Sequence, residues 1–218
     1  MLEKMTYLLY PGNHEQFFEQ IEQIFPRPDE RYYYIERAYQ AAKDAFRPDV
    51  RETGERYFEH LRIVALILIH HLRIIDHELI AAALLHDIVE DKVEWPIERV
   101  TDEFGPRVGR LVAFLTNPSK TKYPDKEHRE YIIRRRLVHA PRDFLFSKLA
   151  DRLHNVFTLC GCSKEKQVRK IEETKRLYMS YAEREKILIH ELEEGMERIV
   201  SEWGSAPVVE LHQERGTA

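Results

Sequence analysis

The stretch Leu84-Leu85-His86-Asp87-Ile88-Val89-Glu90-Asp91 places an adjacent His-Asp pair one helical turn before an adjacent Glu-Asp pair. The residues from Glu78 to Leu85 are almost wholly Ala, Leu and Ile, which is typical of a buried helix. Residues four apart share a helix face, so the histidine is expected to lie under the glutamate, and the first aspartate under the second. Ionisable groups at the end of a buried helix are unfavourable unless something compensates them. A bound divalent cation would do so; a last turn that frays into solvent is the alternative.

Composition excludes several classes of function. The chain has 218 residues, of which 43% are hydrophobic and 33% charged, and its formal net charge is −4. It therefore lacks the basic field of proteins that bind nucleic-acid polymers. No apolar run reaches the roughly 18 residues that span a bilayer, and the first residues lack the apolar core of a signal peptide. We expect a cytoplasmic protein with neither a nucleic acid polymer nor a membrane as partner.

The two cysteines, Cys160 and Cys162, are too few for a disulfide framework, which agrees with a reducing compartment. A Cys-x-Cys pair without a second cysteine pair is weak support for zinc, and two ordinary thiols are the simpler interpretation.

Helix-period patterning runs through the chain, and several predicted helices begin at a capping residue. Asn13 forms a predicted capping box with Gln16, and Asp29 and Asp76 precede two further apolar-periodic segments. No segment with strand periodicity is long enough to be useful. We expect one all-α domain over residues 1–203 and a disordered tail over 204–218. The predicted helices span residues 13–25, 29–46, 57–72, 78–91, 95–105, 106–115, 125–139, 141–158 and 164–203, the last with a break near Gly195.

A second polar constellation lies in the stretch Lys148–Thr158. Asp151, Asn155 and Thr158 fall at positions i, i+4 and i+7, so they share one face of a helix whose opposite face is apolar. An aspartate in an otherwise packed helix again calls for a compensating cation. His154 points away from this polar stripe, and we expect it to lie outside a metal shell.

A third candidate is His60, which lies on the same apolar stripe as Val64 and Leu68. A lone histidine on an apolar face is more often a hydrogen-bonded core residue than a ligand. The prediction of a metal site therefore depends on the combination of a His, a His-Asp pair and an Asp, in this order, on three helices. We expect structural roles for the histidines without such partner spacing, which are His70, His71, His77, His128, His139, His190 and His212.

This combination resembles the HD-domain phosphohydrolases, and more narrowly the hydrolase domain of the RelA/SpoT-type alarmone enzymes, over about residues 50–184. The bare His-Asp dyad is common to a very large superfamily, whereas H-D-x-x-E-D together with L-A-D-R-L-H-N is much more specific. The resemblance implies an all-α HD-domain helical bundle. The matching segments are R-x-x-G-x-x-Y-x-x-H from Arg51 to His60, A-A-L-L-H-D-I-V-E-D from Ala82 to Asp91, E-F-G-P-R-V from Glu103 to Val108, K-L-A-D-R-L-H-N from Lys148 to Asn155, and Glu173-Thr174 with Tyr178.

The resemblance also implies a metal centre and a pair of catalytic acids. A mixed imidazole and carboxylate shell suits Mn²⁺, the typical ion of this family, and also Fe²⁺ or Zn²⁺. A free carboxylate one turn from the ligands is a natural base for an attacking water molecule. The residues that match the metal ligands are His60, His86, Asp87 and Asp151. Those that match the pair that holds and deprotonates the water are Glu90 and Asp91.

Other positions match substrate contacts of the family. Arg51 matches a residue that packs against the purine base, and a guanidinium group suits planar stacking. Asn155 and Thr158 match contacts to the nucleotide sugar and base. We expect the leaving pyrophosphate to stay close to Lys148 or Arg56.

We therefore expect metal-dependent removal of the 3′-diphosphate from a guanosine alarmone, (p)ppGpp, to give GDP or GTP and pyrophosphate. The family usually has Lys after Arg51, and Glu52 in this chain reverses that charge at the mouth of the site. Another HD-type phosphatase acting on NADPH or a 5′-nucleotide stays open, as does a nucleotide-sensing module without turnover. The complete Glu90-Asp91 pair favours an enzyme. No synthetase region follows, so we expect a stand-alone small hydrolase, as a monomer or a homo-oligomer.

Overall fold

The computed structural model describes residues 5–8 and 12–203, and the predicted tail over 204–218 lies outside them. The all-α prediction is confirmed over these residues, where the β structure is limited to an isolated bridge between Val50 and Arg56. Within the same ranges, every helix is too short or too polar to cross a membrane. The helices are η2 Thr6–Leu8, α1 His14–Ile24, α2 Glu30–Ala45, α3 Tyr57–Leu66, the π-helix η3 Ile67–His71, α4 His77–Leu85, α5 Ile88–Asp91, α6 Ile97–Leu115, α7 Lys126–Val138, α8 Arg142–Phe157, η4 Thr158–Gly161, α9 Lys164–Leu177, α10 Met179–Glu185 and α11 Ile189–Glu202.

The predicted helix caps are present. The Asn13 side chain accepts a hydrogen bond from the Gln16 amide at 2.9 Å, and the Gln16 side chain accepts one from the Asn13 amide at 2.9 Å, which completes the capping box. Asp29 and Asp76 accept hydrogen bonds from backbone amides in the first turns of α2 and α4. These local interactions satisfy amides that have no partner inside a helix.

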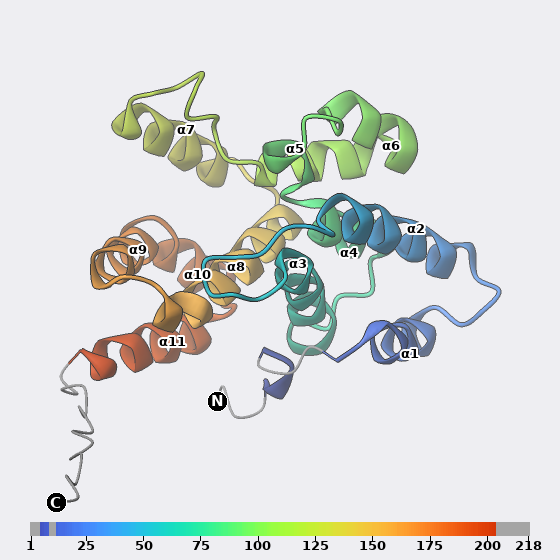
Figure 1. Ribbon diagram of the computed structural model, residues 1–218, viewed down its shortest axis with the longest axis horizontal. Coiled ribbons are helices and arrows are strands. Elements are labelled where there is room, and N and C mark those ends of the chain that lie inside the picture. Colours follow the sequence, from blue (N-terminus) through green and yellow to red (C-terminus); the bar gives the residue numbers. More distant parts are fainter. Residues whose placement is uncertain (1–4, 9–11, 204–218) are drawn as a thin grey trace, which may run out of the picture.

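Helix α8 crosses the middle of the molecule (Figure 1), where it packs against α3, α4, α6, α10 and α11. Helix α4 is enclosed in the same way by α2, α3, α6 and α8, and every side chain from Leu79 to Leu85 is buried. Burying so much apolar surface is the main stabilising contribution to the fold. The polar residues at the end of α4 and along α8 are therefore held inside the protein.

The helix predicted to continue through Asp91 is interrupted. Helix α4 ends at Leu85, and His86 and Asp87 form a turn before α5 begins at Ile88. The Nδ1 atom of His86 lies 2.8 Å from the carbonyl oxygen of Ala83, which in a continuous α-helix accepts from the amide of Asp87. The side chain thus takes the place of a helix hydrogen bond, and the helix breaks at the His-Asp pair.

The predicted break near Gly195 is also wrong, because this residue lies inside α11. The chain breaks instead at Tyr178 and between α10 and α11, where Lys186 (φ 57°) and Leu188 (φ 55°) adopt left-handed conformations. A Cβ atom at position 195 would lie only 3.1 Å from a methyl carbon of Val156. The glycine therefore serves the close packing of α11 against α8.

The predicted interruption at Gly105 is present. This residue has φ 81° within α6 and is followed by Pro106, so the helix changes direction there. A positive φ is readily adopted only by glycine. Helix α6 packs against α4 and α8.

Candidate functional site

A cluster of imidazole and carboxylate groups lies where α3, the turn after α4 and α8 meet. The Nε2 atom of His60 lies 3.4 Å from Oδ1 of Asp151 and 3.7 Å from Oδ2 of Asp87. The Nε2 atom of His86 lies 3.2 Å from Oδ2 of Asp87 and 3.7 Å from Oδ1 of Asp151. One atom each from His60, His86 and Asp151 falls within a 4.8 Å group that could hold a metal ion. The structure thus brings together the four predicted metal ligands.

The two imidazoles present one ring nitrogen each to the centre of this cluster. A carbonyl oxygen can only accept, so the hydrogen bond to Ala83 puts the proton of a neutral His86 on Nδ1 and leaves a lone pair on Nε2. This buried Nε2 atom has no hydrogen-bond partner. A metal ion would satisfy such an orphaned atom, and the donor set of imidazole nitrogens and carboxylate oxygens fits a divalent first-row ion.

The side chains of the cluster shift one another's pKa values. Burial opposes the ionised form of Asp151, but Lys148 and the two imidazoles outweigh it and hold the pKa of this carboxyl well below its usual range. Burial likewise disfavours a charged imidazole, yet Asp87 and Asp151 raise the pKa of His86 to about 10. The shift of His86 shows that the two carboxylates favour positive charge beside them, as a bound cation would require, whereas burial and the charge of Arg51 lower the pKa of His60.

Glu90 and Asp91 lie beside the cluster at the end of α5. The carboxylate of Glu90 accepts two hydrogen bonds, each 3.0 Å long, from the amide and the side chain of Asn117. Both acids are accessible to solvent, but partial burial and the charge of Asp87 raise the pKa of each. The Tyr57 hydroxyl donates to Asp87 at 2.8 Å. Such an environment suits a carboxylate that accepts a proton from water.

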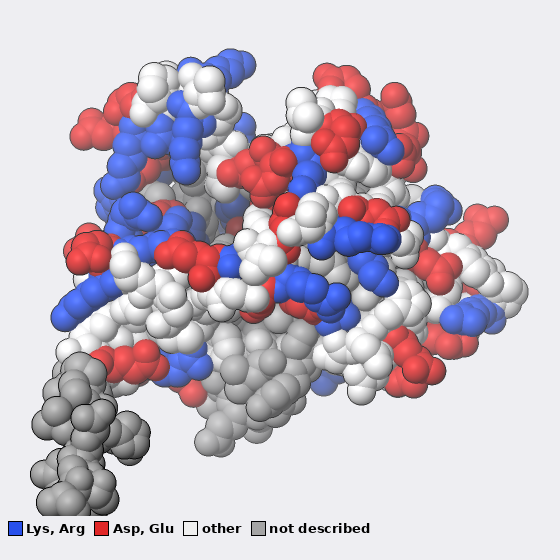
Figure 2. All heavy atoms as spheres, viewed as in Figure 1, with Lys and Arg blue, Asp and Glu red and all other residues white. Residues whose placement is uncertain are grey.

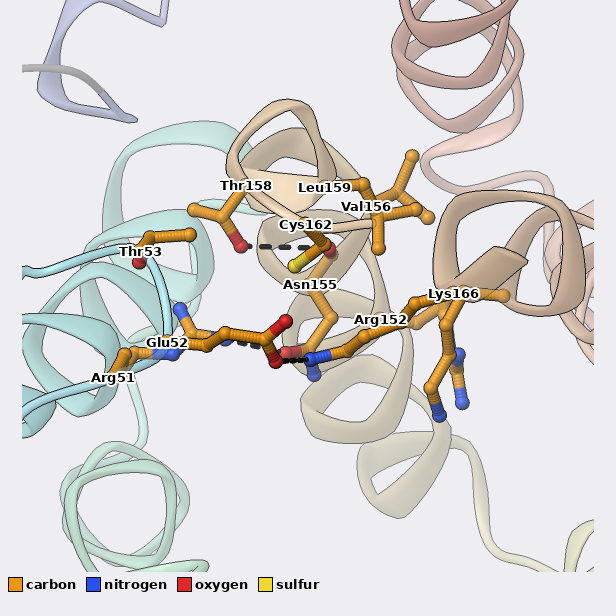
Figure 3. A pocket seen from close by; sticks show the side chains of 11 residues that line it. Arg51, Glu52, Thr53, Arg152, Asn155, Val156, Thr158, Leu159, Cys162 and Lys166 are labelled. Carbon is orange, nitrogen blue, oxygen red and sulfur yellow. Dashed lines mark hydrogen bonds and ion pairs between the residues drawn. The ribbon is translucent and has the colours of Figure 1, made fainter. Parts of the chain in front are cut away.

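A pocket adjoins the cluster between the loop that follows α2, α8 and the start of α9 (Figure 3). Nη2 of Arg51 donates to Oδ1 of Asn155 at 2.8 Å, and Nδ2 of Asn155 donates to Oδ1 of Asp151 at 2.5 Å. Three predicted substrate residues therefore line a pocket that is hydrogen-bonded to the candidate metal centre. The lining residues are Arg51, Glu52, Thr53, Arg152, Asn155, Val156, Thr158, Leu159, Cys162, Lys166 and Lys170.

The other two predicted cations do not line this pocket. Lys148 is buried beneath the cluster, where its ammonium group donates to the carbonyl of Leu115 at 3.1 Å and to Asp151 at 3.3 Å. Arg56 is exposed and pairs with Glu59 at 2.5 Å. The pocket instead has three cations to which sequence reasoning gave no role, namely Arg152, Lys166 and Lys170.

Arg152 shows why these cations were missed. An adjacent Asp-Arg pair is usually a surface feature, but Arg152 is buried. It pairs with Glu173 at 2.7 Å and lies 4.1 Å from the centroid of the Tyr178 ring. Glu173 and Tyr178 both belong to the matching segment Glu173-Thr174 with Tyr178, yet only the fold places them against α8.

Figure 2 shows further Lys and Arg side chains gathered over α7 and α9.

Glu52, at the mouth of the pocket, has a charged partner. Glu52 forms an ion pair with Lys166 from α9, which Figure 3 shows as a contact across the pocket. The negative charge that sequence analysis places at the mouth is therefore compensated by a nearby lysine.

The comparisons with known proteins agree with one another. The sequence pattern described as "HD domain" matches residues 38–188. The guanosine-3′,5′-bis(diphosphate) 3′-pyrophosphohydrolase of Aquifex aeolicus is 38% identical over 170 residues, or 76% of this chain and 23% of that protein. The bifunctional (p)ppGpp synthase/hydrolase SpoT of Escherichia coli K12 is 32% identical over 187 residues, or 84% of this chain and 26% of that protein. The chain thus spans about a quarter of the length of these relatives.

A solved structure is also similar. It is described as a metazoan ortholog of SpoT that hydrolyses ppGpp and plays a role in starvation responses. The two structures superpose with a TM-score of 0.64 at 26% sequence identity, and the match covers 78% of this chain and 96% of that one.

Proposed function

We propose, from the premise that this chain belongs to the HD-domain family, that it hydrolyses a guanosine alarmone of the (p)ppGpp type at its 3′-diphosphate. The products would be pyrophosphate and GDP or GTP. The observation that carries this proposal is that two hydrogen bonds, from Arg51 to Asn155 and from Asn155 to Asp151, join a pocket lined with cations to the buried cluster that could hold a metal ion. We propose Mn²⁺ as the ion, with Fe²⁺ or Zn²⁺ suited to the same donors, and the cytoplasm as the setting.

Each proposed ligand would use an atom that is already directed into the cluster. His60, His86, Asp87 and Asp151 would hold the ion. When bound, the ion would polarise a phosphoryl oxygen and make a water molecule more acidic.

The pocket would hold the nucleoside. The planar guanidinium group of Arg51 suits stacking against a purine, and Asn155 and Thr158 offer polar groups to the sugar and base. Lys166 and Lys170 from α9 would face the anionic phosphates, a role that the sequence prediction gave to Lys148 and Arg56.

In the proposed reaction, Glu90 and Asp91 hold the attacking water, and Glu90 accepts one of its protons. The water oxygen forms a bond to the phosphorus attached to the ribose 3′-oxygen, and the bond between that phosphorus and the 3′-oxygen breaks. The electron pair stays on the 3′-oxygen, which takes up a proton to become a hydroxyl group. The new oxygen leaves with pyrophosphate. Asn117 would hold Glu90, and Tyr57 would hold Asp87, in position for this step.

The Glu52–Lys166 ion pair keeps a second candidate open. It lowers the positive charge available to phosphates, so a less anionic nucleotide such as NADPH or a 5′-nucleotide is the alternative substrate. A panel of nucleotides incubated with the protein and Mn²⁺, with products identified by mass, tests the proposal. Turnover of the alarmone above that of the others supports it, and turnover of none contradicts it.

Glu52→Lys is expected to lower the Michaelis constant for the alarmone, or to leave it unchanged. The change frees Lys166 and adds a second cation at the mouth, which attracts an anionic substrate. Steady-state kinetics at fixed ionic strength measure the effect. Glu52→Gln is the matched control, because it frees the lysine without adding a charge and should have a smaller effect. If Glu52→Lys instead abolishes alarmone turnover, Glu52 serves a less anionic nucleotide.

A further inference from the structure

His154 is a buried residue of α8 that contacts the candidate metal centre without belonging to it. Its Nδ1 atom lies 2.7 Å from Nδ1 of His60, and the two rings stack with centroids 4.9 Å apart. The side chain is fully buried, and its other ring nitrogen has no hydrogen-bond partner. None of the pocket or cluster roles assigned above uses this imidazole.

A second contact fixes which nitrogen of His154 carries a proton. Nη1 of Arg51 lies 3.3 Å from the same Nδ1 atom. A guanidinium group can only donate, so Nδ1 of His154 must accept, and the ring proton must be on Nε2. His60 must then be the donor of the bond between the two histidines, with its own proton on Nδ1. This leaves a lone pair on Nε2 of His60, the atom that faces Asp87 and Asp151.

The two histidines of the cluster are therefore held in the same tautomer by different partners. His86 donates from Nδ1 to the backbone carbonyl of Ala83, a partner that side-chain substitution does not remove. His60 donates from Nδ1 to a side chain. Partners of this kind orient an imidazole ligand and increase its basicity.

The contact of His154 with Arg51 belongs to one of two hydrogen-bonded branches that start at Arg51. From Arg51, one branch passes through His154 to His60, and the other passes through Asn155 to Asp151. Both branches end on side chains that face the centre of the cluster. A ligand that engages the Arg51 guanidinium group therefore alters the partners of two metal-facing residues at once.

We propose that His154 is a positioning residue that holds His60 in the metal-binding tautomer and, through Arg51, couples the nucleotide pocket to the metal centre. The proposal rests on the proposed function in that it requires a metal to bind at the cluster. Because binding coupling is reciprocal, occupancy of the pocket by a nucleoside must change metal affinity by the same factor by which metal changes nucleoside affinity.

The test compares two substitutions at one position. His154→Leu removes the acceptor and is expected to weaken Mn²⁺ binding by about 10- to 100-fold. His154→Asn keeps an acceptor, because the amide oxygen can take the place of Nδ1, and should restore most of the affinity. Binding is measured by titrating the full chain with Mn²⁺. The titration is monitored by calorimetry or by the electron paramagnetic resonance signal of free Mn²⁺. The control is His190→Leu, which removes an exposed imidazole of α11 and should leave the affinity unchanged.

The coupling is tested with guanosine, which lacks phosphates that chelate the ion. Saturating guanosine is expected to change the Mn²⁺ dissociation constant of the parent by about 5-fold or more. In His154→Leu this factor should fall, and what remains of it would come from the branch through Asn155. Equal factors in the parent and the variant would overturn the link through Arg51.

The outcomes separate this inference from the proposed function. If the parent binds none of Mn²⁺, Fe²⁺ and Zn²⁺, both are wrong. If the parent binds Mn²⁺ and a folded His154→Leu variant binds it equally well, only the positioning role is overturned. Should the leucine variant fail to fold, nitrogen-15 spectra of the parent decide the matter, because His60 should be protonated at Nδ1 and His154 at Nε2. The opposite tautomers would overturn the proposal.

Discussion

His86→Ala is expected to abolish Mn²⁺ binding and, with it, measurable nucleotide hydrolysis. The change removes the orphaned Nε2 atom that faces the centre of the cluster. It also leaves Asp87 and Asp151 with one imidazole fewer, and removing one partner of a buried charge destabilises a protein by about 3–5 kcal/mol. Titration with Mn²⁺ and thermal unfolding, each with and without the ion, measure the two effects.

His190→Ala is the control, because it removes a histidine that is exposed on α11. It should keep Mn²⁺ affinity, the increase in melting temperature caused by the ion, and hydrolysis. If His86→Ala bound Mn²⁺ as tightly as the parent, the metal centre would be wrongly assigned.

Glu90→Gln is expected to keep the metal and lose roughly two to four orders of magnitude in turnover. An amide can still contact Asn117 but cannot accept a proton from water. Single-turnover hydrolysis at saturating Mn²⁺ measures the loss. Because partial burial raises the pKa of Glu90, the parent should lose activity as pH falls through a value above that of an ordinary glutamate. The variant should lack this acidic limb.

Glu94→Gln is the matched control for this prediction, since Glu94 is an exposed acid a few residues further along the chain. It should turn over like the parent. If Glu90→Gln stayed within a few-fold of the parent, the proton would go elsewhere, with Asp91 as the next candidate.

The parts of the fold that sequence analysis predicted correctly depend on local interactions. Asn13 and Asp76 cap their helices through backbone amides two or three residues away, so short patterns suffice to find them. The break after Leu85 was missed because it depends on one imidazole that takes a backbone carbonyl. Gly195 was misinterpreted because it serves contact with Val156 on another helix, and no local pattern encodes that contact.

The same distinction applies to the site. Helix periodicity and the motif resemblance located the clustered His and Asp residues, and the HD-family prediction is confirmed by the match over residues 38–188. The roles assigned to individual residues remain predictions. What sequence analysis could not find are partners far apart in the chain. His154 bonds to His60 across 94 positions, and Lys166 pairs with Glu52 across 114. Only the packing of α3, α8 and α9 brings these pairs together.

The central claim is that water attacks the phosphorus next to the ribose and releases both 3′-phosphates together. Incubating the chain with Mn²⁺ and the guanosine alarmone in water enriched in oxygen-18, and identifying the products by mass spectrometry, tests it directly. We predict equal amounts of pyrophosphate and of a nucleoside with a free 3′-hydroxyl and an intact 5′-diphosphate, with the heavy oxygen in the pyrophosphate alone. Release of orthophosphate alone, or heavy oxygen in the 3′-hydroxyl, would contradict the claim.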